Sequence, residues 1–149
     1  MHEILRRRTI LFAAVAASLI SNPIARADEE IYVKIAIETP DTVVYGHLID
    51  NAAARRFAEG LPLSLTLEDY ASTEKVADLG ETLPSDNMPS GFEPKAGDIT
   101  QYIPWANLAI FHRGFRYSEG LVKLGEIDQG LDVLRRPGKV NVTIERDPR

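Results

Sequence analysis

The sequence predicts a small, mainly β domain in which eight strands close into a barrel and two short helices cover its ends. Apolar and polar residues alternate with a period of two along most of the chain, which is typical of half-buried strands. Only two segments have the spacing of amphipathic helices, and both are short. An open sheet of eight strands would leave two unpaired edges, and closure into a barrel removes them.

The first 27 residues have the three parts of a secretory signal. A basic head, residues 6–8, precedes an apolar run of 12 residues, 9–20, and a small-x-small site ends at Ala27. Because a membrane-spanning helix needs roughly 20 apolar residues, we expect cleavage before Asp28 and no membrane contact afterwards. The pair Arg7-Arg8 also resembles the start of a twin-arginine signal of bacteria. We therefore expect an exported protein, periplasmic or secreted.

Charge and cysteine content limit the chemistry of the remaining domain, residues 28–149. Cleavage at Ala27 removes four arginines and one glutamate from 17 basic and 22 acidic residues, which leaves 13 basic and 21 acidic ones. This excess of acidic residues repels phosphate backbones, so we expect no nucleic acid partner. With no cysteine and only His47 and His112 left, we expect no metal site. No phosphate-binding or dinucleotide-binding glycine motif is present, so we expect no cofactor.

The first half of the domain is predicted to contain a hairpin, a helix and two further strands. Asp50 or Asn51 caps a short helix in which Ala53 and Phe57 share one face, and Gly60 helps to end it. The four predicted strands in this half are residues 31–38, 43–48, 63–68 and 75–79.

The second half is predicted to begin with a long surface loop, residues 80–97, which has three prolines and little apolar periodicity. Loops of this length in compact domains are usually functional or mobile. Asp128 is predicted to cap a second helix that carries Leu131 and Leu134. The remaining strands are predicted at residues 98–103, 108–111, 121–126 and 140–144, with a polar, aromatic loop at 113–120.

The order of these elements resembles the cyclophilin barrel, with one helix after the second strand and another before the last. Residues 124–134, Leu-Gly-Glu-Ile-Asp-Gln-Gly-Leu-Asp-Val-Leu, are similar to the cyclophilin stretch in which a strand enters the second helix. Residues 97–111, including Asn107 and Phe111, resemble the cyclophilin strand pair that ends in Asn-Gly-Ser-Gln-Phe-Phe. As a whole, residues 31–146 look most like the small bacterial cyclophilin-like proteins, a family without a settled activity.

The same resemblance implies that the isomerase residues are replaced. Cyclophilins carry Phe-His-Arg on the third strand, where the arginine stabilises the twisting prolyl amide, and this chain has no arginine there but has Glu68. The tripeptide at 111–113 repeats those letters, yet it falls at the end of the sixth predicted strand. Lowering a barrier of roughly 18 to 20 kcal/mol requires a donor aimed at the amide as it loses planarity. We therefore assign no catalytic residue and expect reduced or no isomerase activity.

Aromatic residues around one predicted turn are the first candidates for a ligand site. Trp105 follows Pro104 between two strands and lies near Tyr102 and Asn107, so it can form the floor for a peptide or a small apolar ligand. The alternative is that Trp105 packs over a barrel end. Phe111 matches a cyclophilin pocket residue, although its apolar neighbours also fit a core position.

Charged residues near this turn are the second candidates. His112 and Arg113, together with Arg116 and Tyr117, can form a cationic, aromatic lip for a carboxylate or a peptide carbonyl. The alternative is that these arginines pair with surface acids such as Glu119. A third candidate is the acidic turn beside Tyr70, which contains Glu68, Asp69 and Glu74. Its carboxylates can bind a hard cation or serve as general acid and base. The alternative is that they form a solvated turn.

From these observations we expect a binding module that accepts a peptide segment or small ligand in a groove on the barrel. Two alternatives stay open: a divergent prolyl isomerase that uses Arg113 or Arg116, and an accessory domain of another exported protein. Oligomeric state is left open. The expected ligand-binding residues are Tyr102, Trp105, Asn107, Phe111, His112 and Arg113.

Overall fold

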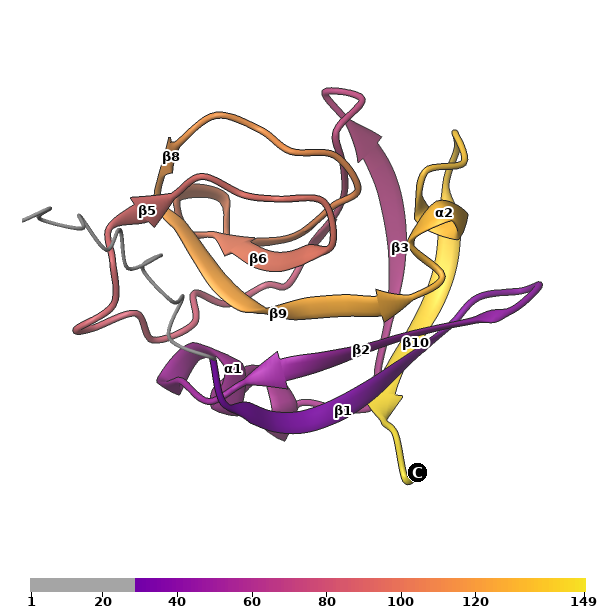
Figure 1. Cartoon of the computed structure of the whole chain (residues 1–149), viewed down its shortest axis with the longest axis horizontal. Helices are drawn as coiled ribbons and strands as arrows, with labels where there is room; N and C mark the ends of the chain where they lie inside the picture. The colour runs from indigo at the N-terminus through magenta and orange to yellow at the C-terminus, as the bar shows by residue number, and fades with distance from the viewer. Residues whose placement is uncertain (1–28) are drawn as a thin grey trace, which may run out of the picture.

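A computed structural model describes residues 29–149, so the predicted signal peptide lies outside the described residues. Eight of the strands have two neighbours each and form one closed barrel, in the order β1-β10-β3-β4-β7-β6-β9-β2 (Figure 1). This confirms the predicted eight-stranded barrel. Its strands are β1 (Ile31–Glu38), β2 (Val43–Ile49), β3 (Leu63–Tyr70), β4 (Glu74–Asp78), β6 (Asp98–Tyr102), β7 (Asn107–Phe111), β9 (Leu121–Gln129) and β10 (Val140–Arg146).

Two short helices pack on this barrel, as expected. In α1 (Ala52–Glu59) the cap is Asn51, whose side chain accepts a hydrogen bond from the Ala54 amide at 2.8 Å. The helix buries Phe57 and three alanines. Helix α2 (Leu131–Leu134) is a single turn whose Leu134 is fully buried. No helix in residues 29–149 has the length and apolar character needed to cross a bilayer.

The predicted cap of the second helix was wrong. Gly130, in a left-handed conformation with φ 90°, occupies that position because β9 continues to Gln129. Asp128 lies within this strand, and its carboxylate contacts Nδ1 of His47 at 2.9 Å. Strand β9 is longer than predicted because it pairs with β6 along its first part and with β2 along its second.

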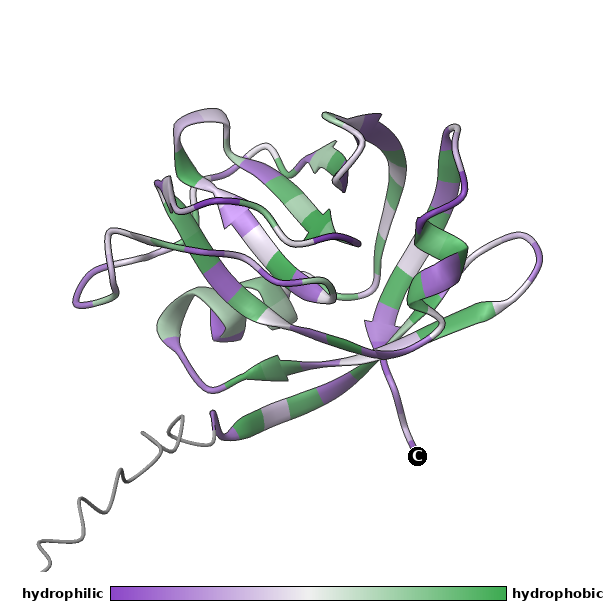
Figure 2. Cartoon of the chain, turned by 45° about the horizontal axis from the view of Figure 1, so that its top comes forward, coloured by the Kyte–Doolittle hydropathy of each residue, from purple (hydrophilic) through white to green (hydrophobic). Residues whose placement is uncertain are grey.

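Alternate side chains of the barrel strands fill the interior, and Figure 2 shows the resulting alternation of hydrophobic and hydrophilic residues. Among the fully buried residues are Ile35, Ile37, Val44, Leu48, Leu67, Leu108, Ile110 and Leu124.

Lys75 is one of a few polar residues among the buried ones, with only 1% of its surface exposed. Its Nζ donates hydrogen bonds to the carboxylate of Asp69 and to the carbonyl oxygens of Arg136 (2.8 Å) and Gly138 (2.7 Å). Asp69 also accepts a bond from the Gly138 amide at 2.6 Å. These donors lower the pKa of Asp69. We call these four residues the Lys75 clasp, which ties the β3–β4 hairpin to the segment between α2 and β10.

Outside the barrel, two loops pack against each other through a small sheet of β5 (Gly91–Phe92) and β8 (Ser118–Glu119). A Cβ at Gly91 would lie 2.3 Å from the Ser118 carbonyl oxygen, so this approach requires glycine. The chain before β8, residues 112–117, bows outward in Figure 1 and is called the arch below. Its backbone is held by the Thr73 and Pro94 carbonyls.

Candidate functional site

A groove of about 450 Å³ lies on the outer face of the barrel, between the β3–β4 turn, the β6–β7 hairpin and the arch. We call it the outer groove. It is lined by Tyr70, Ala71, Glu74, Tyr102, Trp105, Asn107, Phe111, Phe115, Arg116, Tyr117, Ser118, Glu119 and Leu121.

Four of the six expected ligand-binding residues line the outer groove: Tyr102, Trp105, Asn107 and Phe111. They meet because β6 and β7 form a tight hairpin in which Tyr102 lies directly opposite Asn107. Phe111 belongs to a small apolar cluster on this outer side and is separate from the main core. It is therefore both buried and part of the groove wall.

His112 and Arg113 are not among the lining residues. His112 follows the outward-facing Phe111 and is only 4% exposed. Burial lowers the pKa of His112, and the nearby charges of Lys75, Arg113 and Arg135 lower it further. From the proposed cationic lip, the structure brings only Arg116 and Tyr117 to the groove.

The aromatic floor of the groove is built around Trp105, which is 57% exposed. It ends the short 3-10 helix η1 (Ile103–Trp105), and Ala106 follows in a left-handed turn with φ 52°. Two tyrosines meet its ring edge to face: Tyr70 at 5.7 Å and 83°, and Tyr102 at 5.2 Å and 87° between ring planes. These contacts fix the indole while leaving much of it open to a ligand.

On the arch side, Phe115 stacks with Phe111 at 6.5 Å between ring centres. The guanidinium of Arg116 lies 4.8 Å from the centre of the Phe115 ring. Tyr117 donates a hydrogen bond to the Glu119 carboxylate at 3.1 Å. The arch wall therefore presents aromatic rings with one cation and one acid at its rim.

Two polar groups lie deeper. The half-buried Glu74 accepts a hydrogen bond from the Thr73 hydroxyl at 2.9 Å, and burial raises its pKa despite that bond. The Oδ1 atom of Asn107 is buried and has no hydrogen-bond partner in the described chain. The sequence indicated Glu74 and Tyr70 only as an acidic turn. The missing signal was the pairing of β4 with β7, which places Glu74 opposite Phe111.

Strand β3 contains no arginine, and Glu68 is one of its acidic residues. Glu68 lies opposite Val76, and its carboxylate pairs with Lys139 at 3.0 Å. It does not line the groove, and Arg116 is the only arginine in the described chain that does. No three metal-ligating side chains cluster anywhere in residues 29–149.

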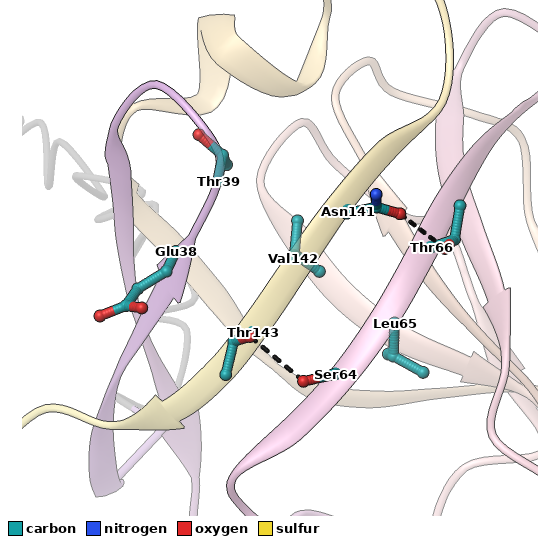
Figure 3. Close-up of a pocket in the computed structure, with 8 residues that line it drawn as sticks. All are labelled: Glu38, Thr39, Ser64, Leu65, Thr66, Asn141, Val142 and Thr143. Carbon is teal, nitrogen blue, oxygen red and sulfur yellow. Dashed lines mark hydrogen bonds between the residues drawn. The ribbon is translucent and has the colours of Figure 1, made fainter.

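A second depression, of about 440 Å³, lies over β1, β10 and β3 (Figure 3). Four of its polar side chains are paired across β3 and β10. Ser64 and Thr143 are 3.2 Å apart, and Thr66 donates to the Asn141 side chain at 2.8 Å. This depression therefore offers few free groups to a ligand.

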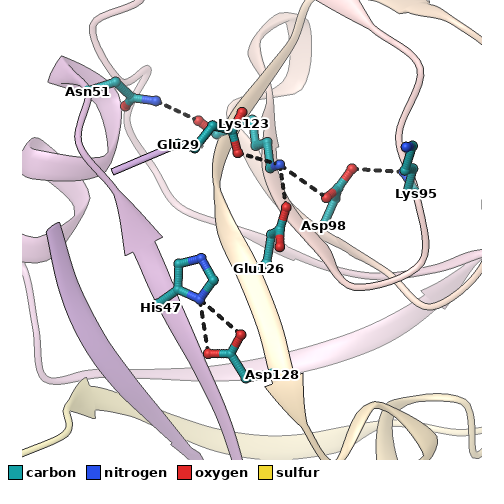
Figure 4. A network of polar contacts seen from close by, with 8 residues as sticks. All are labelled: Glu29, His47, Asn51, Lys95, Asp98, Lys123, Glu126 and Asp128. Atoms are coloured by element: carbon teal, nitrogen blue, oxygen red, sulfur yellow. Dashed lines mark hydrogen bonds and ion pairs between the residues drawn. The ribbon is translucent and has the colours of Figure 1, made fainter. Parts of the chain in front are cut away.

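Lys123 forms the centre of a charged network drawn in Figure 4. Its Nζ lies 2.6 Å from carboxylate oxygens of Glu29 and Glu126 and 3.6 Å from Asp98. Burial acts to lower the pKa of Lys123, but the hydrogen bonds to these acids outweigh it and raise the pKa. Burial raises the pKa of Asp98. Lys123 is thus paired with three carboxylates, and its contact with Glu29 fastens the first described residues to β9.

Comparison with known proteins agrees with this architecture. A search of curated proteins found no match. A solution structure of a hypothetical protein from Archaeoglobus fulgidus is similar, with a TM-score of 0.58 and 15% sequence identity over 81% of this chain and 99% of the other. At that identity the likeness shows the fold. The model of the cyclophilin-like family matches residues 37–145, which is most of the chain, and the protein therefore belongs to the cyclophilin-like family.

Proposed function

We propose that this protein is a non-enzymatic binding module that holds a peptide segment or a small ligand in the outer groove. The observation that supports this most is Trp105, a large aromatic side chain left 57% exposed although two tyrosines hold its ring in place. Fixed, exposed aromatic rings beside a few polar groups are typical of ligand-binding surfaces.

Trp105 also provides the test, because it is the only tryptophan in the chain. Titration with a library of short peptides should give a saturable change in intrinsic fluorescence, and amide NMR shifts should move at the β6–β7 turn and the arch. By calorimetry, Trp105→Ala should lose binding. Ile31→Ala is the matched control, since Ile31 is a similarly exposed apolar residue on β1, outside the groove. Equal binding by wild type and Trp105→Ala would contradict the proposal.

A divergent prolyl isomerase is the second candidate, and it is favoured by one observation, the presence of Arg116 in the groove lining. This guanidinium stacks on Phe115 at the rim, and no arginine is available from β3. In an assay with proline-containing peptides we expect no catalysed turnover. Clear turnover that disappears in Arg116→Ala would favour the isomerase over the binding module.

We propose further that the mature protein acts after export. Support comes from the basic head, the apolar run and the small-x-small site in residues 1–27. Expression of the full chain in a bacterium, followed by mass analysis of the periplasm and medium, should recover a product that begins at Asp28. Recovery of the uncleaved chain in the cytoplasm alone would contradict export. Copurification of the exported product with one partner, without peptide binding, would instead favour the accessory domain.

A further inference from the structure

We propose that the outer groove selects a cationic side chain, a lysine or arginine, within an extended peptide. This inference rests on the proposed function and names the chemistry of its ligand. Three features of the groove support it: a half-buried carboxylate without a cationic partner, an uncompensated amide oxygen, and exposed aromatic faces.

The carboxylate is that of Glu74. Half-burial removes part of its hydration, and within the described chain its hydrogen-bond partner is a neutral hydroxyl, that of Thr73 at 2.9 Å. By contrast, the partly buried charge of Lys123 is compensated by nearby carboxylates. A charge that is partly desolvated without a counterion is costly. A ligand cation would supply the missing counterion.

The amide oxygen is Oδ1 of Asn107, which is buried at the groove and receives no hydrogen bond from residues 29–149. The negative end of this amide dipole is therefore uncompensated in a residue that lines the groove. Buried polar atoms without a partner are uncommon in folded proteins. Its field adds to that of Glu74, and both favour positive charge in the groove.

The aromatic faces come from Trp105 and the two tyrosines that hold it. Tryptophan has the most favourable ring for a cation, and the interaction strengthens when water is excluded. The long aliphatic stems of lysine and arginine can pack on the same rings while their charged ends reach the acid. A neutral apolar side chain would gain only the packing.

The groove already contains one cation, Arg116, and its position decides whether it neutralises the carboxylate of Glu74. The Arg116 guanidinium lies over the Phe115 ring at 4.8 Å, on the exposed arch. Within residues 29–149 this guanidinium forms no ion pair or hydrogen bond with Glu74, whose hydrogen-bond partner is Thr73. With Glu74 and Glu119 as acids and Arg116 as the base, the lining has an excess of negative charge.

The test uses residues 28–149 and four blocked peptides that differ at one position, which holds lysine, arginine, norleucine or glutamate. Calorimetry should give affinities for the lysine and arginine peptides on the order of tenfold above that for norleucine. Glu74→Gln should reduce this preference to less than about twofold. Glu68→Gln is the matched control, because Glu68 lies on the neighbouring strand outside the groove and should leave the preference unchanged.

Arg116→Glu gives an independent test that does not touch the barrel wall. It replaces the rim cation by an acid on the exposed arch, so the lysine peptide should bind several-fold more tightly. Equal affinities for lysine and norleucine, or tighter binding of glutamate, would overturn the selectivity while leaving the binding module in place. If none of the four peptides binds, the proposed function itself fails.

Discussion

Replacement of Lys75 by methionine tests how the barrel end is held together. The side chain is fully buried, and its ammonium donates to the Asp69 carboxylate and to two backbone carbonyls beyond α2. Methionine has a similar length and fills the same space, but it donates no hydrogen bond. Lys75→Met therefore removes the centre of the Lys75 clasp without opening a large cavity.

The expected loss of stability depends on the Asp69 carboxylate, which the substitution leaves without its cationic partner. Breaking a buried, hydrogen-bonded charge pair by removing one partner costs about 3–5 kcal/mol. Because the Asp69 side chain is 42% exposed, water can replace part of the lost contact. We therefore expect Lys75→Met to lower the free energy of unfolding by about 2–4 kcal/mol, with a fall in Tm on the order of 10 °C.

Urea unfolding of residues 28–149, followed by circular dichroism, measures this loss. The matched control is Lys139→Met, because Lys139 is mostly exposed and its ion pair with Glu68 should contribute less than about 1 kcal/mol. In a double-mutant cycle, Asp69→Asn should cost much less in the Lys75→Met background than in wild type. If Lys75→Met is no more destabilising than Lys139→Met, the clasp does not hold the barrel end.

Two further predictions concern other parts of the barrel. Gly125→Ala should lower the free energy of unfolding by about 1–3 kcal/mol, because a Cβ there would lie 2.0 Å from the His47 carbonyl oxygen. The control in the same unfolding assay is Gly60→Ala, which should be tolerated because the nearest atom to its Cβ would be 3.6 Å away. The folded-state pKa of Asp69 is lowered from 3.8, so its stabilising effect is present above that pH and lost in acid. The difference in unfolding free energy between wild type and Asp69→Asn should therefore stay constant above about pH 5 and shrink as the pH falls below about 4.

Most of the fold was predictable because it depends on local patterns. Strand β10 alternates between polar and apolar residues, and Asn51 stands where a helix cap is expected. Strands β5 and β8 were missed because each has only two residues, too few to show an alternation of polar and apolar side chains. The burial of Lys75 could not be predicted from the sequence either, since an isolated lysine in a strand normally faces water.

The candidate site was predictable only where it is local in sequence. Tyr102, Trp105 and Asn107 belong to one hairpin, so a sequence pattern places them together. Glu74 reaches the groove through the pairing of β4 with β7, which are about thirty residues apart in the chain. His112 was expected at the groove but faces the other way, because neighbouring residues at a strand end point to opposite sides.

The position of β10 between β1 and β3 has a consequence for the order of folding. Strand β1 gains its second neighbour only when β10, the last strand, has been synthesised. A nascent chain that stops before residue 140 therefore leaves one edge of β1 and one edge of β3 unpaired. Such distant pairings slow folding and leave incomplete chains prone to aggregation. A chain truncated before β10 should therefore collect in insoluble material, and β10 supplied as a separate peptide should restore it by filling the gap between β1 and β3.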